Sequence, residues 1–140
     1  MENQENTNKS IMVQNEVFEE KNYYSSITPA DAEGQKKLFN ALDSCDLKIS
    51  DQIGETIDLK DVYIEKYIKD ENGEKKEKIR TILFDKDGKS YVSTAFGIFK
   101  SVVRIFRIYG QPQDWAAPLK VTFSEQQLKD GKRSFTLRLA

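Results

Sequence analysis

The sequence contains no histidine and a single cysteine, and these two scarcities exclude most catalytic and metal-binding chemistry. Cys45 has no partner for an internal disulfide, and no imidazole is present to activate its thiol or to share a metal ion. General acid–base catalysis would depend on carboxylates, which cluster in turns and tails rather than at the ends of several apolar strands. Glycine-rich phosphate loops and metal-ligand spacings are also missing. We therefore expect a protein that is not an enzyme and that uses no cofactor or metal.

Long apolar runs are absent as well. The longest one, over residues 97–109, is interrupted by Lys100, Arg104 and Arg107, so no segment suits a membrane span. The first five residues do not resemble a signal peptide. A chain of 140 residues with 38% hydrophobic residues is large enough for one folded domain with its own core. We expect a cytoplasmic protein without membrane contact.

Acidic and basic residues are unevenly distributed behind a net charge of −1. Residues 1–34 have a net charge of −5, and residues 35–140 have a net charge of +4. Residues 1–28 are rich in Glu, Asn, Gln and Ser, which predicts a mostly disordered acidic arm before a domain over residues 29–140. The mildly basic domain suits a polyanionic partner. The acidic arm is expected to be dispensable for binding and to compete with phosphates for the basic surface of the domain.

The apolar periodicity predicts a mainly β domain. A short N-terminal helix over about residues 29–42 would start with Thr28 as N-cap and Pro29 at its first position. A second helix is predicted over residues 96–109, and the strands are predicted over 56–68, 77–84, 90–95, 119–123 and 135–139. A change of parity near Lys60 indicates a β-bulge in the first strand. Five strands with one helix between the third and fourth is the connectivity of the OB-fold, so we expect an OB-fold-like barrel.

Two dipeptides that are typical of two-residue hairpin turns, Asn72-Gly73 and Asp87-Gly88, separate the first three strands. If both turns have this form, the opposing pairs on one face are Tyr63 with Ile82, Glu65 with Arg80, Tyr67 with Lys78, and Phe84 with Tyr91. The other face then collects the core residues Val62, Ile64, Ile79, Leu83 and Val92. A three-residue turn at either place would flip one strand to the opposite face.

The first of these faces combines aromatic rings with cations, namely Tyr63, Tyr67, Lys78, Arg80, Phe84 and Tyr91. Exposed rings stack on nucleobases while cations pair with phosphates, so we predict a site for single-stranded nucleic acid here. The basic loop before the last strand adds Lys132 and Arg133. Two alternatives remain: the rings pack beneath the N-terminal helix as a second core, or they dock another protein.

Four segments of the chain resemble the phage-type single-stranded-DNA-binding proteins of phages and mobile elements of Gram-positive bacteria: residues 36–42, 58–65, 87–91 and 97–101. The likeness extends from about residue 36 to residue 139. It implies an OB-like domain that coats single-stranded DNA in replication or recombination in the bacterial cytoplasm, with no catalytic centre. Replication or recombination proteins would be its further partners. No pattern in the sequence fixes an oligomeric state.

Overall fold

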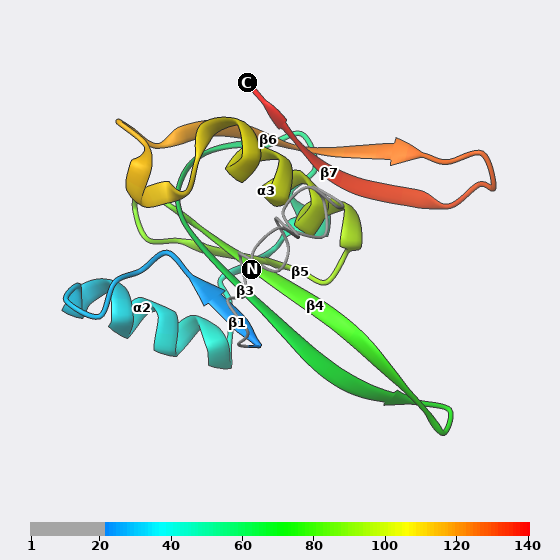
Figure 1. The fold of residues 1–140 in the computed structure, drawn as a ribbon. Helices are drawn as coiled ribbons and strands as arrows, with labels where there is room; N and C mark the ends of the chain where they lie inside the picture. Colours follow the sequence, from blue (N-terminus) through cyan, green and yellow to red (C-terminus); the bar gives the residue numbers. More distant parts are fainter. Residues whose placement is uncertain (1–21) are drawn as a thin grey trace, which may run out of the picture.

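The computed structural model describes residues 22–140 and is mainly β (Figure 1). In chain order the elements are β1 (Tyr23–Ser25), α2 (Ala32–Asp43), β2 (Leu47–Lys48), the 3-10 turn η2 (Ile49–Asp51), β3 (Thr56–Glu71), β4 (Glu74–Asp85), β5 (Ser90–Ser93), α3 (Phe96–Tyr109), the 3-10 turn η3 (Pro112–Asp114), β6 (Leu119–Gln127) and β7 (Arg133–Leu139).

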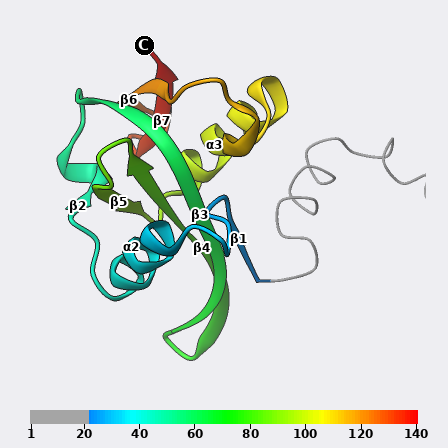
Figure 2. The same cartoon turned by 90° about the vertical axis from the view of Figure 1, so that its left-hand side faces the viewer.

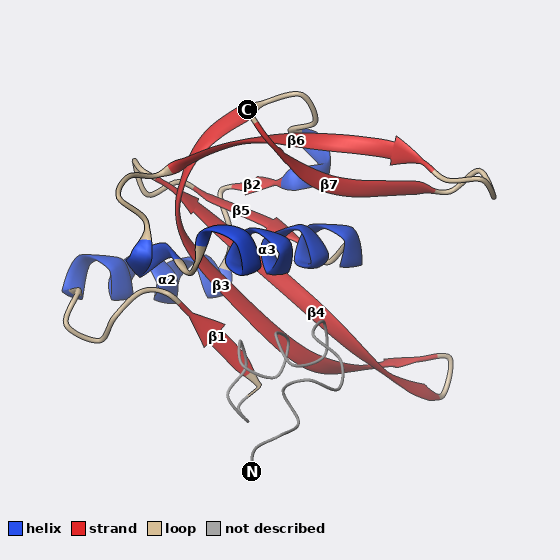
Figure 3. Cartoon of the chain, turned by 45° about the horizontal axis from the view of Figure 1, so that its top comes forward, coloured by secondary structure: helices blue, strands red, loops and turns tan. Residues whose placement is uncertain are grey.

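The strands form one sheet that curls into a half-barrel (Figure 3). Its order is β2-β5-β4-β3-β6-β7, and β1 pairs with β3 beside this path. Strand β3 pairs with β6 over residues 56–59 and with β4 over the rest of its length. The pairing shifts between Leu59 and Asp61, which confirms the predicted bulge and bends β3 between its two neighbours. Within residues 22–140 the two ends of the sheet, β2 and β7, do not pair with each other.

The predicted number of strands is wrong. The five long strands occur in the expected order, but the described chain has seven strands because β1 and β2 precede β3. Helix α3 consequently lies between the fifth and sixth strands. Both additional strands have only two or three residues, which is too short for a period-two pattern to be recognised.

Helix α3 spans the predicted residues and fills the concave side of the sheet. Its buried face, which includes Phe99 and Val102, packs against Val62, Ile64 and Phe123 of the strands. Each fully buried side chain of this size contributes about 1.5–3 kcal/mol. This helix therefore organises the main core. None of the helices in residues 22–140 is long and apolar enough to cross a membrane.

Helix α2 lies on the opposite face of the sheet from α3 (Figure 2). Its N-cap is Asp31 and not Thr28, because the Asp31 carboxylate accepts a hydrogen bond from the Gly34 N–H at 2.9 Å. A Cβ at Gly34 would lie 2.5 Å from an Asp31 carboxylate oxygen and 2.8 Å from Ile27, so a larger residue here would require the side chain of the N-cap or of Ile27 to shift. Together with Ile27, this helix builds a second, smaller core on the sheet.

The packed domain begins earlier than the predicted boundary at residue 28. Strand β1 pairs with residues 63–65 of β3, and the side chains of Tyr24 and Ile27 are buried. The Tyr24 ring lies 5.3 Å from Phe106 between centroids, and its hydroxyl donates to Oε1 of Gln111 at 2.9 Å. Residues 1–21 of the predicted arm lie outside the described residues.

Two N-terminal deletions should therefore differ in stability. Removing residues 1–28 deletes β1 with the buried Tyr24 and Ile27, and we expect the free energy of unfolding to fall by at least about 3 kcal/mol. Removing only residues 1–21 leaves those contacts in place and is the matched control. Urea denaturation measures both; equal stability of the two deletion variants would contradict the packing of β1.

Candidate nucleic-acid interface

The two hairpin turns have different lengths. At the first turn, Asn72 and Gly73 have positive φ values of 53° and 83°, as a two-residue turn requires. The predicted pairs of Tyr63 with Ile82 and Tyr67 with Lys78 are confirmed. At the second turn the Asp85 N–H donates to the Lys89 carbonyl at 3.0 Å, which leaves a three-residue loop. The register of β5 is therefore shifted by one residue from the prediction, and Tyr91 lies opposite Leu83 rather than Phe84.

This shift places Tyr91 in the main core. Tyr91 is 5% exposed, its ring centroid is 5.4 Å from that of Phe123, and its hydroxyl donates to Oδ2 of Asp85 at 3.0 Å. Burial, reinforced by this hydrogen bond, raises the pKa of Tyr91 to about 12. Val92, which was predicted on the face of the main core, instead lies on the α2 face of the sheet and packs against the second core. The expected exposure of Tyr91 is wrong.

Tyr63 and Phe84 do lie on the predicted face, but α2 covers them. They are 7% and 3% exposed and pack with Leu38 and Ala41. The Tyr63 hydroxyl donates to Oε1 of Glu65 at 3.0 Å, and burial raises the pKa of Tyr63 to about 12. For these two rings the alternative prediction is confirmed: they pack beneath the N-terminal helix as part of a second core. The same burial removes them from any protein-docking face.

Tyr67, Lys78 and Arg80 remain half-buried on the outer face of the β3–β4 hairpin. Arg80 pairs with Glu65, and the Lys78 Nζ lies 3.5 Å from Oε2 of Glu71. Their charges are thus partly neutralised within the hairpin.

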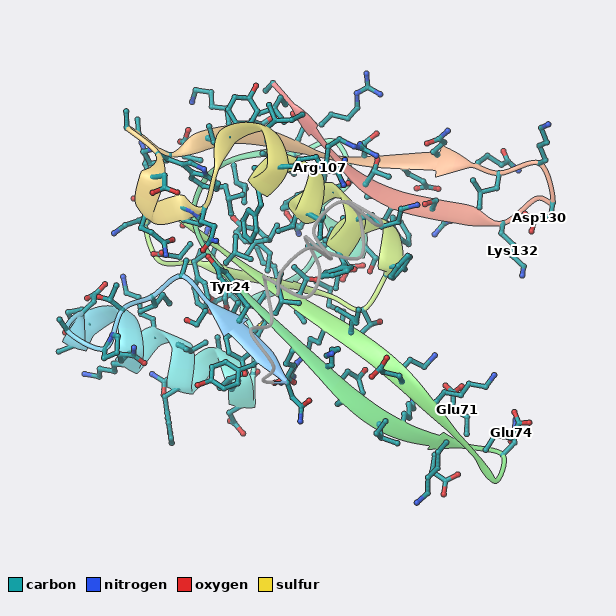
Figure 4. The ribbon with its side chains drawn as sticks, viewed as in Figure 1. Tyr24, Glu71, Glu74, Arg107, Asp130 and Lys132 are labelled. Carbon is teal, nitrogen blue, oxygen red and sulfur yellow. The ribbon has the colours of Figure 1, made fainter. Side chains whose placement is uncertain are left out.

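The β3–β4 and β6–β7 hairpins extend from the body on the same side (Figures 1 and 3). Figure 4 marks Glu71 and Glu74 near one tip and Asp130 and Lys132 near the other. Exposed Lys75 at the first tip and Lys132 at the second belong to no ion pair within residues 22–140. Both predicted cations of the second hairpin are thus at an exposed tip, although Arg133 Nε also lies 3.1 Å from Oε2 of Glu125.

A ring that the predicted site did not include, Phe96, lies at the start of α3 and is 56% exposed. Lys100 Nζ lies 5.9 Å from its centroid, and the Arg133 guanidinium lies 5.6 Å from the Phe135 ring on the adjacent β7. Gly97 allows this approach of helix and strand, because a Cβ there would lie 2.3 Å from the Phe135 carbonyl oxygen. The sequence signal was the four-residue spacing of Phe96, Lys100 and Arg104, which places them on one helix face.

We call the following set the inter-hairpin surface: Ile68, Lys75, Phe96, Lys100, Lys132, Arg133 and Phe135. Along β3, Ile68 points to the same face of the sheet as the core residue Ile64. Along β4, Lys75 points to the same face as Thr81, which pairs with Ile64. Both side chains therefore lie on the α3 side of the β3–β4 hairpin. The structure thus separates the eight predicted residues: three are buried, and three lie on the outer face of one hairpin. Lys132 and Arg133 lie on the β6–β7 hairpin, where the Arg133 guanidinium lies over Phe135.

An exposed ring beside a cation on α3, with half-buried rings and further cations on two hairpins of a curled sheet, suits a single-strand nucleic-acid-binding domain. Residues 22–140 contain no group of three or more His, Cys, Asp or Glu side chains that would hold a metal ion. A family model described as phage single-stranded DNA-binding protein matches residues 18–140. The chain belongs to this family, and the resemblance noted in its sequence is confirmed. No curated protein and no solved structure matches the chain.

Proposed function

We propose that this protein coats single-stranded DNA during phage or mobile-element replication and recombination in the bacterial cytoplasm, with little sequence preference and without catalysing a reaction. The observation that carries the proposal is the exposed Phe96 ring with Lys100 above it, in a chain from a single-stranded-DNA-binding family. The ring lies between the β3–β4 hairpin and the net basic β6–β7 hairpin. Aromatic rings stack on every base, and cations follow the backbone whatever its sequence. The half-barrel acts as an OB-fold-like domain in this proposal.

The strand would pass across the inter-hairpin surface. Phe96 and Phe135 supply stacking faces, while Lys75 and Lys132 approach the phosphates from opposite hairpins. The outer face of the β3–β4 hairpin, with Tyr67, is a secondary contact. Replication or recombination proteins would meet the coated strand as further partners.

Titration of a labelled dT oligonucleotide, monitored by fluorescence anisotropy, tests this function. We expect similar affinities for dT and for a mixed-sequence single strand, and much weaker binding of the corresponding duplex. Affinity should fall steeply between low and physiological salt, because phosphate contacts release counterions. Tighter binding of duplex than of single strand, or no binding of either, would contradict the proposal.

The salt dependence should identify the two hairpin tips as phosphate contacts. Single strands lose about 0.7 in the slope of log K against log salt for each phosphate contact removed. Replacing Lys75 and Lys132 together by Ala should therefore flatten the slope by about 1.4.

The matched control is Lys36→Ala with Lys48→Ala, which removes two exposed lysines from α2 and β2 without touching the hairpins. Its slope should equal that of the unchanged protein. If both double variants flatten the slope equally, only net charge matters and the tips are not contacts.

A further inference from the structure

Helix α3 presents an exposed stripe that the main core does not use. Phe96, Lys100, Arg104, Arg107 and Ile108 are all exposed and follow one another at intervals of one to four residues along one side of the helix. The helix contains no acidic residue. None of its three cations belongs to an ion pair within residues 22–140.

Stability of the helix does not account for this charge pattern. Lys100 with Arg104, and Arg104 with Arg107, are like-charge pairs at spacings where opposite charges would stabilise a helix. Arg107 is favourable in the last turn because of the helix dipole, but Lys100 and Arg104 lie farther from that end. A ligand that carries several negative charges would explain the arrangement.

The stripe leads into a groove between α3 and β7. This groove has a volume of about 390 Å³ and is lined by Arg104, Ile108 and Tyr109 of the helix and by Arg138 of the strand, among others. The Ser101 hydroxyl accepts the Leu137 N–H at 3.0 Å and donates to the Gly97 carbonyl at 2.9 Å, so the helix is fastened to the strand beside it. The groove therefore has a fixed frame with a cation on each side.

We propose that this stripe, together with Arg138 and Tyr109, forms a second contact track for single-stranded DNA; the inference rests on the function proposed above. The track is continuous with the inter-hairpin surface, because Phe96 and Lys100 belong to both. Lys100 and Arg104 are about 6 Å apart along the helix axis at a rise of about 1.5 Å per residue. One guanidinium group can donate two parallel hydrogen bonds to the oxygens of a phosphate. Tyr109, which is 48% exposed, provides an aromatic ring for stacking in the groove at the C-terminal end of α3.

This occupant is favoured over an acidic protein segment by the position of the rings. The cationic stripe begins at the exposed ring of Phe96, which already lies in the proposed DNA path, and the exposed ring of Tyr109 lines the groove into which the stripe leads. Rings interleaved with cations suit alternating bases and phosphates. A strand that stacks on Phe96 would thus be guided along α3 into the groove, and a longer strand would make more contacts than a short one.

The test compares two oligonucleotide lengths. Affinities of full-length protein for dT of about 6 and about 16 nucleotides are measured at physiological salt, a range that covers typical site sizes of such domains. Replacing Arg104 and Arg138 together by Ala should weaken binding of the longer strand about ten-fold while changing the shorter one less than two-fold. The variant Arg104→Gln with Arg138→Gln removes the same two charges but keeps polar side chains in the groove. It should show the same loss, which excludes a folding defect of the Ala variant as the cause. The pair Lys36→Ala with Lys48→Ala is the charge-matched control.

The outcomes separate the track from the proposed function. Failure of the unchanged protein to bind either strand overturns both. Normal binding of both lengths by the Arg104 and Arg138 variants overturns the track alone, and so does an equal loss on both lengths, which indicates a diffuse charge effect. Unchanged DNA binding with lost binding of a glutamate-rich peptide would assign the stripe to an acidic protein partner instead.

Discussion

Replacing Phe96 by Ala is expected to weaken the binding of dT oligonucleotides about ten-fold or more while leaving the melting temperature nearly unchanged. A base stacked on an aromatic side chain is worth about 1–3 kcal/mol by alanine substitution, and about 1.4 kcal/mol corresponds to a factor of ten. Phe96 is 56% exposed, and its ring centroid lies 5.8 Å from that of Phe99 in a tilted arrangement. Its loss should therefore cost the fold little.

Phe39→Ala is the matched control for this variant. Phe39 is 77% exposed on α2, which lies away from the two hairpin tips (Figure 1). Its removal deletes an exposed ring of the same kind without changing the inter-hairpin surface, so affinity should stay unchanged. Anisotropy titration and thermal unfolding of both variants decide the matter. If Phe39→Ala weakens binding as much as Phe96→Ala, stacking at Phe96 is not specific to this surface.

Tyr91→Ala should have the opposite profile, a large loss of stability without a specific loss of binding. The ring is buried against Phe123, and truncating a large buried aromatic side chain costs about 3–5 kcal/mol. Tyr91→Phe keeps the ring but leaves Oδ2 of the buried Asp85 without its tyrosine donor, which should cost about 1–3 kcal/mol. Urea denaturation measures both variants. A Tyr91→Ala variant that is fully stable but binds DNA weakly would restore the two-residue turn and the exposed ring.

The second hairpin turn shows why the shift of one residue in the register of β5 could not be predicted from the dipeptide Asp87-Gly88. Asp87-Gly88 is as good a turn signal as Asn72-Gly73, but Oδ1 of Asp85 accepts the N–H groups of both Asp87 and Lys89 at 2.9 Å. These two hydrogen bonds favour the three-residue loop. The turn propensity of a dipeptide does not take into account hydrogen bonds from a side chain two residues upstream. The resulting shift of one residue in the register of β5 moves Tyr91 to the other face of the sheet.

The remaining difference at the site arises from tertiary packing. The alternation of β3 and β4 correctly places Tyr63 and Phe84 on one face, and the pairing of the first hairpin is as predicted. Whether that face meets water depends on α2, which is separated from β4 by 30 residues and covers it through Leu38 and Ala41. Local patterns fix which side chains share a face, whereas the choice of the covering element is a property of the whole chain.

Helix α3 was the most predictable element and also contained the overlooked ring. Its apolar period gives both ends correctly, and Gly110, with φ of 82°, follows its last residue. The apolar face of this helix does not include Phe96. Its spacing to Lys100 and Arg104 places it on the solvent side, where an aromatic residue among cations is informative.

The most direct measurement of the central claim is photocrosslinking of a bromodeoxyuridine-substituted single strand to the protein, followed by mass spectrometric mapping of the modified residues. Our account predicts crosslinks at Phe96 and Phe135, with Tyr67 as a weaker site, and the loss of the Phe96 crosslink in Phe96→Ala. Crosslinks concentrated at Phe39 of α2, with none on α3 or on either hairpin, would contradict it.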